Sequence, residues 1–294
     1  RIYATALSAD DVKELYNTRA QIDNKGNFFV NNLQQTGHQP LLMDYTIWQD
    51  GQSGSVGMFA VNGSATENYR VLGSDPWGKE TVLWEARPDA ASGADGGWVR
   101  SPYVPIDNTK THRISTWIRR TVIGNGTGYL GTNGGGSAVL TLSGTANTNP
   151  YFWSGGISTT EWILYVGHVH PAGYTGGVHP DSGRYYVDGT KIASATDFKC
   201  DVGTTSLRHR SYLYYSTDIN TRQQWAYPRF DICDGTEPSL AELLSGFDSN
   251  YIDFIREKGG TATLPLNVGN QLTYAGEISE LGPTNGLVAY YPLN

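Results

Sequence analysis

Charged residues are scarce in this chain of 294 residues: only 17% are Asp, Glu, Lys or Arg, and the formal net charge is -7. A nucleic-acid-binding surface needs a net basic face, so this balance argues against nucleic acid as a partner. No apolar run approaches the roughly 20 residues of a membrane-spanning helix, and Arg1 does not open an export signal. We therefore expect no membrane insertion and no intact leader, and Arg1 is a poor candidate for the natural start.

Cysteine is nearly absent, since the chain holds only Cys200 and Cys233. Two thiols cannot complete a zinc site, which needs more ligands at close spacing. A disulfide between them would stabilise the fold by roughly 3–4 kcal/mol. The alternative is two free thiols in a protein made in a reducing compartment, and this is the state we expect.

Glycine and aromatic residues are abundant instead, with 36 Gly, 19 Tyr and 8 Trp. This balance is typical of many short strands joined by turns. Strand-like segments separated by Gly, Asn, Asp and Pro clusters are centred on Val82, Trp117, Leu140, Leu213 and Phe230. The spacing predicts an all-β fold, an antiparallel β-sandwich of the jelly-roll type with a few short helices and strand-containing linkers. Pro228 cannot donate to a ladder, so its segment is expected at an edge or bulged.

The clearest supersecondary pattern is WILYVGHVHPAGYTGGVHPDSGRYYV, residues 162–187. Both faces of its first strand, Trp162–His170, are largely apolar at period two, as in an interior strand of a sandwich. Gly and Pro residues then exclude a helix before the returning strand. We therefore predict a hairpin within the sheet whose turn, Pro171–Asp181, projects at one end.

Helices are predicted at three places. Ser8 caps the first, SLAELL after Pro238 forms the second, and Asp248 caps a third that Gly259 ends.

Candidate catalytic groups are missing from the strands. A glycoside hydrolase needs two carboxylates facing across a cleft. Glu85, Glu161, Asp231 and Asp234 do not form such a pair, and salt-bridge or turn roles fit each of them better. No Ser or Cys has the context of a nucleophile. We expect no enzyme and assign no catalytic residue.

A metal site is one interpretation of His168 and His170, which share a face, with His179 and Asp181 in the turn that follows. Hydrogen-bonded imidazoles at the rim of a sheet are the commoner outcome for such residues.

Surplus aromatic residues favour carbohydrate binding, because sugar rings stack on Trp and Tyr while polar groups fix the hydroxyls. Turn segments hold the candidates Trp77, Trp98, Trp153, Tyr174 and Tyr227, although a Trp in a sandwich is buried by default. We predict Tyr174 and Trp153 as stacking groups and His179 and Asp181 as hydroxyl partners, all in loops at one end of the sandwich. Trp98 is a further candidate.

Residues 67–246 resemble a β-sandwich module of virion tail-fibre and structural proteins of marine tailed phages. The resemblance rests on several segments in the same order: ENYRVLGSDPWGKETVLWEARPDAASGADGGW, NTKTHRISTWIRRT, PYFWSGG, VGHVHPAG, HPDSGRYYVDG, LRHRSYLYYSTDINTRQQW and ICDGTEPSLAELL. The flanking segments ALSADDVKELYNTRAQIDNKGN and ELGPTNGLVAYYPLN resemble joints between concanavalin A-like, laminin-G-like lectin repeats.

The resemblance implies five segments. These are the closing strand and helix of a preceding laminin-G-like domain (1–23), a connector (24–66), the central sandwich (67–246), a helix and linker module (247–285) and the opening strand of a following domain (286–294). A strand from either end has no sheet of its own, so we expect a window from a longer tandem protein, or else exchange of a terminal strand between identical subunits.

The implied function is a non-enzymatic, lectin-like module of a tandem-repeat tail fibre or other extracellular fibre. Its partners would be host-surface polysaccharide and neighbouring repeats or identical subunits, on the virion exterior or outside the cell. A purely structural filament repeat is the alternative, and a carbohydrate-active enzyme is the weaker one. Jelly rolls of this class often carry calcium, for which Asp95, Asp107 and Asp181 are candidate ligands, although the sequence alone does not select among them.

Overall fold

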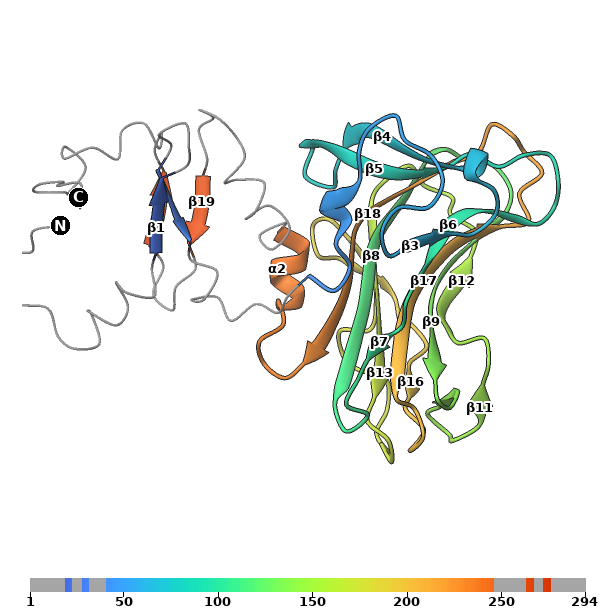
Figure 1. Cartoon of the computed structure of the whole chain (residues 1–294), viewed down its shortest axis with the longest axis vertical. Coiled ribbons are helices and arrows are strands. Elements are labelled where there is room, and N and C mark those ends of the chain that lie inside the picture. Colours follow the sequence, from blue (N-terminus) through green and yellow to red (C-terminus); the bar gives the residue numbers. More distant parts are fainter. Residues whose placement is uncertain (1–18, 23–27, 32–40, 246–262, 267–271, 276–294) are drawn as a thin grey trace, which may run out of the picture. The chain divides into compact units, whose positions relative to one another are not determined.

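The computed structural model describes residues 19–22, 28–31, 41–245, 263–266 and 272–275 (Figure 1). The chain divides into two compact units, and the larger is Gln39–Ser245. The helices predicted at Ser8 and Asp248 and the opening strand predicted from Gly286 lie outside the described residues.

The second unit is described through two antiparallel strand pairs. They are β1 (Arg19–Ile22) with β2 (Phe28–Asn31), and β19 (Thr263–Leu266) with β20 (Leu272–Ala275).

The larger unit is a β-sandwich of two sheets, as the sequence predicts. The ten-stranded sheet runs in the order β11 (Ala146–Asn147), β10 (Val139–Thr141), β16 (Phe198–Lys199), β13 (Ile163–His170), β8 (Thr111–Val122), β18 (Arg222–Cys233), β5 (Glu80–Ala86) and β4 (Asn68–Ser74), with β14 (Gly183–Tyr186) and β15 (Lys191–Ala193) beside β13. The six-stranded sheet runs β12 (Tyr151–Gly155), β9 (Thr127–Gly135), β17 (Ser206–Tyr214), β6 (Ala94–Arg100) and β3 (Phe59–Val61), with β7 (Val104–Pro105) paired to β17. The pairings between these described strands are antiparallel except β13 with β16.

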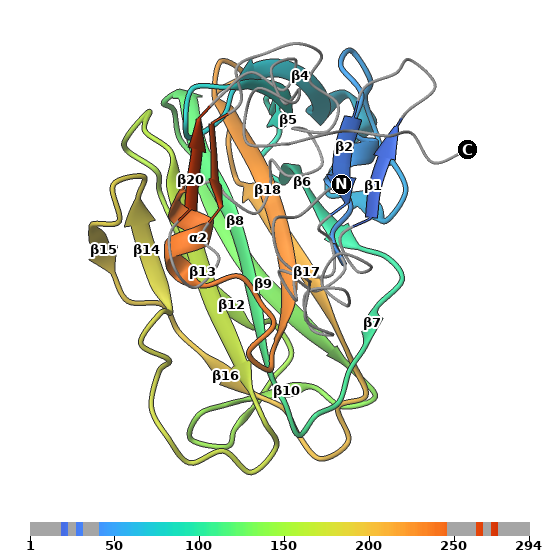
Figure 2. The same ribbon diagram turned by 90° about the vertical axis from the view of Figure 1, so that its left-hand side faces the viewer.

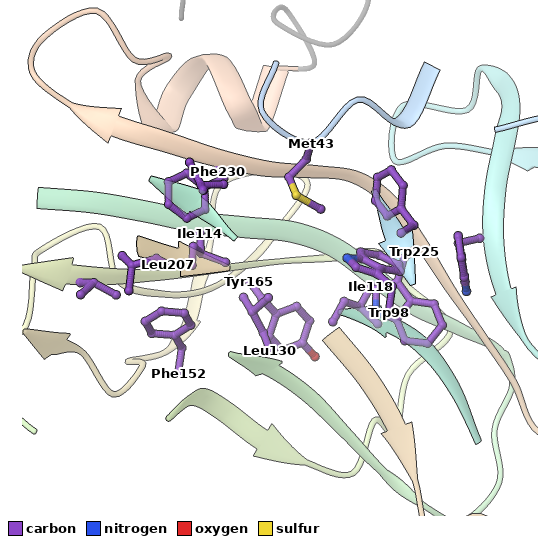
Figure 3. Close-up of a cluster of buried hydrophobic side chains, with 14 of the residues drawn as sticks. Met43, Trp98, Ile114, Ile118, Leu130, Phe152, Tyr165, Leu207, Trp225 and Phe230 are labelled. Carbon is purple, nitrogen blue, oxygen red and sulfur yellow. The ribbon is translucent and has the colours of Figure 1, made fainter. Parts of the chain in front are cut away.

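The core lies between the two sheets and is rich in aromatic rings. Figure 3 shows side chains that meet there from both sheets, among them Trp98 of β6, Leu207 of β17, Tyr165 of β13 and Trp225 of β18. Trp98 and Trp225 meet edge to face with ring centres 5.5 Å apart, an arrangement worth about 0.5–1.5 kcal/mol beyond area burial. This packing holds the strands of both sheets in register.

The predicted interior strand is confirmed. β13 pairs with β8 along one side and with β14 and β16 along the other, and β14 returns antiparallel as the second strand of the hairpin. Every residue of β13 is buried. Leu164 and Val166 pack on the outer face with Leu243 of α2 (Leu240–Ser245), so the ten-stranded sheet is covered on this side as well (Figure 2).

Residues 41–66 contribute more than the expected connector. Met43, Trp48 and Phe59 are buried in the core, and β3 adds an edge strand to the six-stranded sheet. Two short 3-10 helices, η1 (Tyr45–Ile47) and η2 (Ala65–Glu67), complete this segment. The compact unit therefore begins closer to the N-terminus than the module expected from residue 67.

Pro228 lies at a bulge, as predicted for a residue without an N–H. The register of β18 against β8 shifts between Ala226 and Arg229, and Tyr227 adopts φ +50°. The bulge directs the Tyr227 hydroxyl to Asp75, to which it donates a hydrogen bond of 2.7 Å.

Cys200 and Cys233 are free thiols, and burial raises the pKa of each to about 12. Among the described residues, no helix has the length and apolar character required to cross a bilayer.

Candidate ligand-binding face

The structure brings three of the predicted site residues together, in the turn after β13. Tyr174 stacks on His170 with ring centres 3.9 Å apart, and His179 stacks on His168 at the same distance. Asp181 lies beside them, where its backbone N–H donates to His179 Nδ1. The turn therefore folds back over the outer face of the ten-stranded sheet.

Asp197 is the centre of this packing. It accepts hydrogen bonds from the backbone N–H groups of His168 and His179, from His170 Nε2 and from the Ser182 hydroxyl, at 2.6–3.0 Å. Burial alone would raise the pKa of Asp197, but these hydrogen bonds outweigh it and lower the pKa. Burial, with the His179 charge, lowers the pKa of His168 to about 3, so this ring is neutral at physiological pH.

These contacts occupy part of each ring in the turn, although Tyr174, His179 and Asp181 are partly exposed. One face of the Tyr174 ring lies on His170, and its hydroxyl donates to the Gly177 carbonyl. His168 Nδ1 is bonded to Ser182 and His170 Nε2 to Asp197. One ring nitrogen of each histidine in this cluster is thus engaged in a hydrogen bond: His168 Nδ1, His170 Nε2 and His179 Nδ1.

The other two predicted aromatic residues lie elsewhere. Trp153 is half-buried in β12, where its ring contacts Tyr165 of the core at 4.5 Å between ring centres. Trp98 is fully buried in β6, between Trp84, Trp225 and His209. The prediction of Trp98 as a ligand contact is wrong, because an indole enclosed on all sides has no ring face to offer.

A different aromatic surface occupies the outer face of the six-stranded sheet. Strand β17 alternates strictly: Leu207, His209, Ser211 and Leu213 turn toward the core, while Arg208, Arg210, Tyr212 and Tyr214 turn away from it. Cross-strand partners share a face, so Tyr129 of β9, opposite Tyr212, lies on the outer side as well. Tyr151 of β12 joins them opposite Gly131. We call Tyr129, Tyr151, Tyr212 and Tyr214, with Arg208 and Arg210, the tyrosine face.

The four tyrosine rings form a closed set of contacts. Ring centres are 4.6 Å apart for Tyr129 and Tyr151, 6.3 Å for Tyr151 and Tyr212, 5.5 Å for Tyr212 and Tyr214, and 5.9 Å for Tyr214 and Tyr129. Gly131 makes room for this arrangement, because a Cβ there would lie 2.6 Å from the Tyr151 ring. Tyr129, Tyr151 and Tyr214 are partly exposed, and the neighbouring Tyr215 is 56% exposed.

The tyrosine face is positively charged within a chain of net charge -7. The Arg210 guanidinium lies 4.3 Å from the centre of the Tyr151 ring, and that of Arg208 lies 4.5 Å from the ring of Tyr103. Neither arginine forms an ion pair with a described residue, and the Nε of each has no hydrogen-bond partner. Asn133, opposite Arg208 in the register, also has an unpartnered side-chain oxygen.

The phenols of this face are neutral over the physiological range. Burial raises the pKa of Tyr212 to about 12, and it also raises the pKa values of Tyr129 and Tyr214. The face therefore offers partly exposed aromatic surface and neutral hydroxyl groups beside two guanidinium charges, of which Arg208 is partly exposed whereas Arg210 is buried and donates to the Pro150 carbonyl at 3.4 Å.

This surface was not predicted from the sequence, although the sequence contains one pattern that indicates it. The segment RHRSYLY, residues 208–214, places Arg or Tyr at every second position of a strand whose other positions face the core.

The strand carboxylates have structural partners. Glu85 pairs with Arg87 and accepts from Gln224, Asp231 pairs with Arg113 and Arg229, and Asp234 caps the turn at Thr236. These are the salt-bridge and turn roles predicted for them.

Comparisons with known proteins give only remote likenesses. No protein-family profile and no curated protein matches the chain. Among solved structures, an arabinose-bound α-L-arabinofuranosidase is 13% identical with a TM-score of 0.34 over 63% of this chain and 26% of its own. An exo-β-agarase is 11% identical with a TM-score of 0.36 over 66% and 25%. The CBM22-1 xylan-binding domain of Paenibacillus barcinonensis Xyn10C is 13% identical with a TM-score of 0.31 over 64% and 94%.

The chain spans about a quarter of the length of the first two of these proteins. At such identities and TM-scores the likenesses carry no weight for the function of this chain.

Proposed function

We propose that this chain is a non-catalytic carbohydrate-binding module that holds glycan chains on its tyrosine face. The observation that carries the proposal is the closed set of four tyrosine rings, turned away from the core, beside two arginines without carboxylate partners.

Sugar rings match this surface chemically. Their C–H groups pack against aromatic rings, and their hydroxyls exchange hydrogen bonds with phenol and amide groups. A sheet face suits an extended polymer better than a single small molecule, because the rings come from three adjacent strands, β12, β9 and β17.

The arginines favour glycans that carry sulfate or carboxylate groups. Guanidinium groups bind such oxyanions through paired, charge-assisted hydrogen bonds. Tyr151 and Tyr212 hold the Arg210 guanidinium beside the platform, at 4.3 and 5.9 Å from their ring centres. A sulfated or uronate-containing polysaccharide is the ligand class we propose.

The test is a binding screen of the full chain on an array of neutral, sulfated and uronate-containing glycans. Tyr151→Ala and Arg210→Gln alter the tyrosine face, and Tyr174→Ala alters the turn after β13. We expect the first two substitutions to weaken binding at least about tenfold, the scale of losing an interface anchor, and Tyr174→Ala to leave it unchanged.

The outcomes separate the alternatives. No binding to any glycan would refute the proposal and favour a structural filament repeat. Loss of binding only in Tyr174→Ala would move the site to the turn. Release of reducing sugar from a bound polysaccharide would instead indicate a carbohydrate-active enzyme.

Membership of a tail fibre or other extracellular fibre, with host-surface polysaccharide as the partner and other repeats as neighbours, rests on the sequence resemblance alone. We propose it as the setting of the glycan-binding module. Immunogold labelling of native particles with an antibody against this chain tests the setting, because labelling along fibres supports it and labelling elsewhere contradicts it.

A further inference from the structure

Three carboxylates converge at one place that the tyrosine face does not use. Glu67 ends η2, Asp89 lies in the loop between β5 and β6, and Asp95 lies in β6. One oxygen of each lies within 4.8 Å of the other two. Among the described residues, this is the group of His, Cys, Asp and Glu side chains with the spacing of a metal site.

No described cationic side chain forms an ion pair with this acidic group, and backbone N–H groups of Ser64 and Ala91 donate to Glu67 Oε2 and Asp89 Oδ1. Asp95 is fully buried; its Oδ2 accepts a 2.8 Å hydrogen bond from the Ser216 backbone N–H, and its Oδ1 has no partner. Burial, followed by the charges of Glu67 and Asp89, raises the pKa of Asp95 to about 6. The guanidinium of Arg87 is bonded to Glu85 instead, at 2.8 Å. A buried carboxylate oxygen without a partner is costly, which calls for a cation or a proton at this point.

The backbone adds a further oxygen and leaves room beside it. A Cβ on Gly63 would lie 2.5 Å from Glu67 Oε2 and 2.6 Å from the Ala94 carbonyl oxygen, so both oxygens border the space that this glycine leaves open. Gly63 has φ +80°, a conformation that other residues rarely adopt. A side chain is therefore excluded here both by space and by backbone conformation.

We propose that Glu67, Asp89 and Asp95 bind a calcium ion, with the Ala94 carbonyl as a backbone ligand. The donors are all hard oxygens, the set that Ca²⁺ and Mg²⁺ take, without the nitrogen or sulfur donors that zinc and copper favour. Ca²⁺ tolerates irregular mixtures of carboxylate and carbonyl ligands, whereas Mg²⁺ demands a near-octahedral site and retains several waters. Three carboxylates on a fixed backbone suit calcium.

The site would tie together segments that lead into the tyrosine face. Ala94 pairs with Tyr214 across β6 and β17, and the backbone N–H of Tyr215 donates to the Gly93 carbonyl. Calcium would thus hold the end of β17 and the β5–β6 loop in one arrangement. The site does not depend on the proposed glycan function, because its donors are separate from the tyrosines.

The test uses the full chain, stripped with a chelator and dialysed, and Ca²⁺ alone as the probe. Ligand at about 100 times its dissociation constant should raise the midpoint of thermal unfolding by about 5–10 °C, and calorimetric titration should show heat of binding. Asp89→Asn, at an exposed residue, should remove at least half of that shift. Asp188→Asn, at an exposed aspartate outside the acidic group, should keep the whole shift.

Asp95→Asn separates an ion-binding role from a structural one. If Asp95 binds calcium, this variant should match or exceed the wild-type midpoint without Ca²⁺ and lose the Ca²⁺-dependent rise. A lower midpoint in both conditions, with the rise retained, would overturn the proposal. So would the absence of both a shift and binding heat in the wild type, and a Mg²⁺ shift as large as that of Ca²⁺ would overturn the choice of calcium.

Discussion

Acidification is the perturbation to which this sandwich should be most sensitive, because three of its histidines are buried as neutral rings. Burial lowers the pKa of His168 to about 3 and those of His112 and His209 to about 4. His209 shows why the neutral form is required: its Nδ1 accepts from Trp98 Nε1 and its Nε2–H donates to the Ser115 carbonyl. A second proton on His209 would break the contact with Trp98.

The direction of the pH effect on stability follows from the pKa values of each ring in the folded and unfolded states. In the unfolded chain a histidine has a pKa near 6.5, so below this pH the unfolded state binds more protons than the folded state. The stabilisation that each neutral ring contributes is therefore fully present above pH 6.5 and decreases as the pH falls toward the pKa of the folded state. Between pH 7 and pH 5 the titration of each ring lowers the free energy of unfolding by about 2 kcal/mol, and the three rings together lower it by about 5–6 kcal/mol.

The titration of Asp95 acts in the opposite direction, and its contribution to stability is too small to cancel this loss. Its pKa is raised to about 6 in the folded state, so acidification protonates it there and returns about 1 kcal/mol by pH 5. The net loss is about 4 kcal/mol, which should lower the midpoint of thermal unfolding by about 10–15 °C.

The measurement is thermal unfolding by circular dichroism at pH 7, 6 and 5 in buffer without divalent ions. His209→Gln should reduce the pH-dependent drop by about half, because this ring supplies about 2 kcal/mol of the net loss of about 4 kcal/mol. A midpoint that changes by less than about 3 °C between pH 7 and 5 would refute the reasoning.

Three further outcomes are expected. Asp231→Asn weakens the ion pairs that Asp231 forms with Arg113 and Arg229 in the outer face of the ten-stranded sheet, and should lower the free energy of unfolding in urea by about 3–5 kcal/mol; a loss below 1 kcal/mol would contradict this. Tyr151→Ala should cost about 1.4–3 kcal/mol of glycan affinity in calorimetric titration, and undiminished affinity would count against the tyrosine face. Arg210→Gln should weaken binding to a sulfated polysaccharide more than to its desulfated form, and equal losses would remove charge from the account of ligand choice.

Local chemistry made much of the fold predictable from the sequence. An apolar strand with both faces buried, followed by a turn rich in Gly and Pro, predicts an interior strand and a hairpin, and β13 with β14 is that hairpin. Pro228 lacks an N–H, and the bulge at this residue follows directly. In both cases the physical requirement lies within a few neighbouring residues.

The parts that were not predicted depend on contacts between distant segments. Met43 and Trp48 reach the core from a stretch without periodicity, so nothing local marks them as core residues. Trp98 was placed among turn residues, whereas it lies in β6 with its indole against the core. The residues next to Trp98 are polar or glycine and show no strand pattern, so the strand becomes evident only from its pairing with β17.

The tyrosine face combines both situations. Within β17 the alternation of Arg and Tyr is readable, but Tyr129 and Tyr151 join this face only because β9 and β12 pair in a specific register. The candidate site is therefore a product of sheet order, which short-range patterns do not specify.

The central claim is that glycans bind on the tyrosine face, and tyrosine resonances report this directly. The chain is labelled with ¹³C in its tyrosine rings, and spectra are recorded while an oligosaccharide from the best-binding polysaccharide is added. We predict shifts or broadening for Tyr129, Tyr151 and Tyr214, with Tyr174 unchanged. Changes confined to Tyr174, or none at saturating oligosaccharide, would contradict the claim.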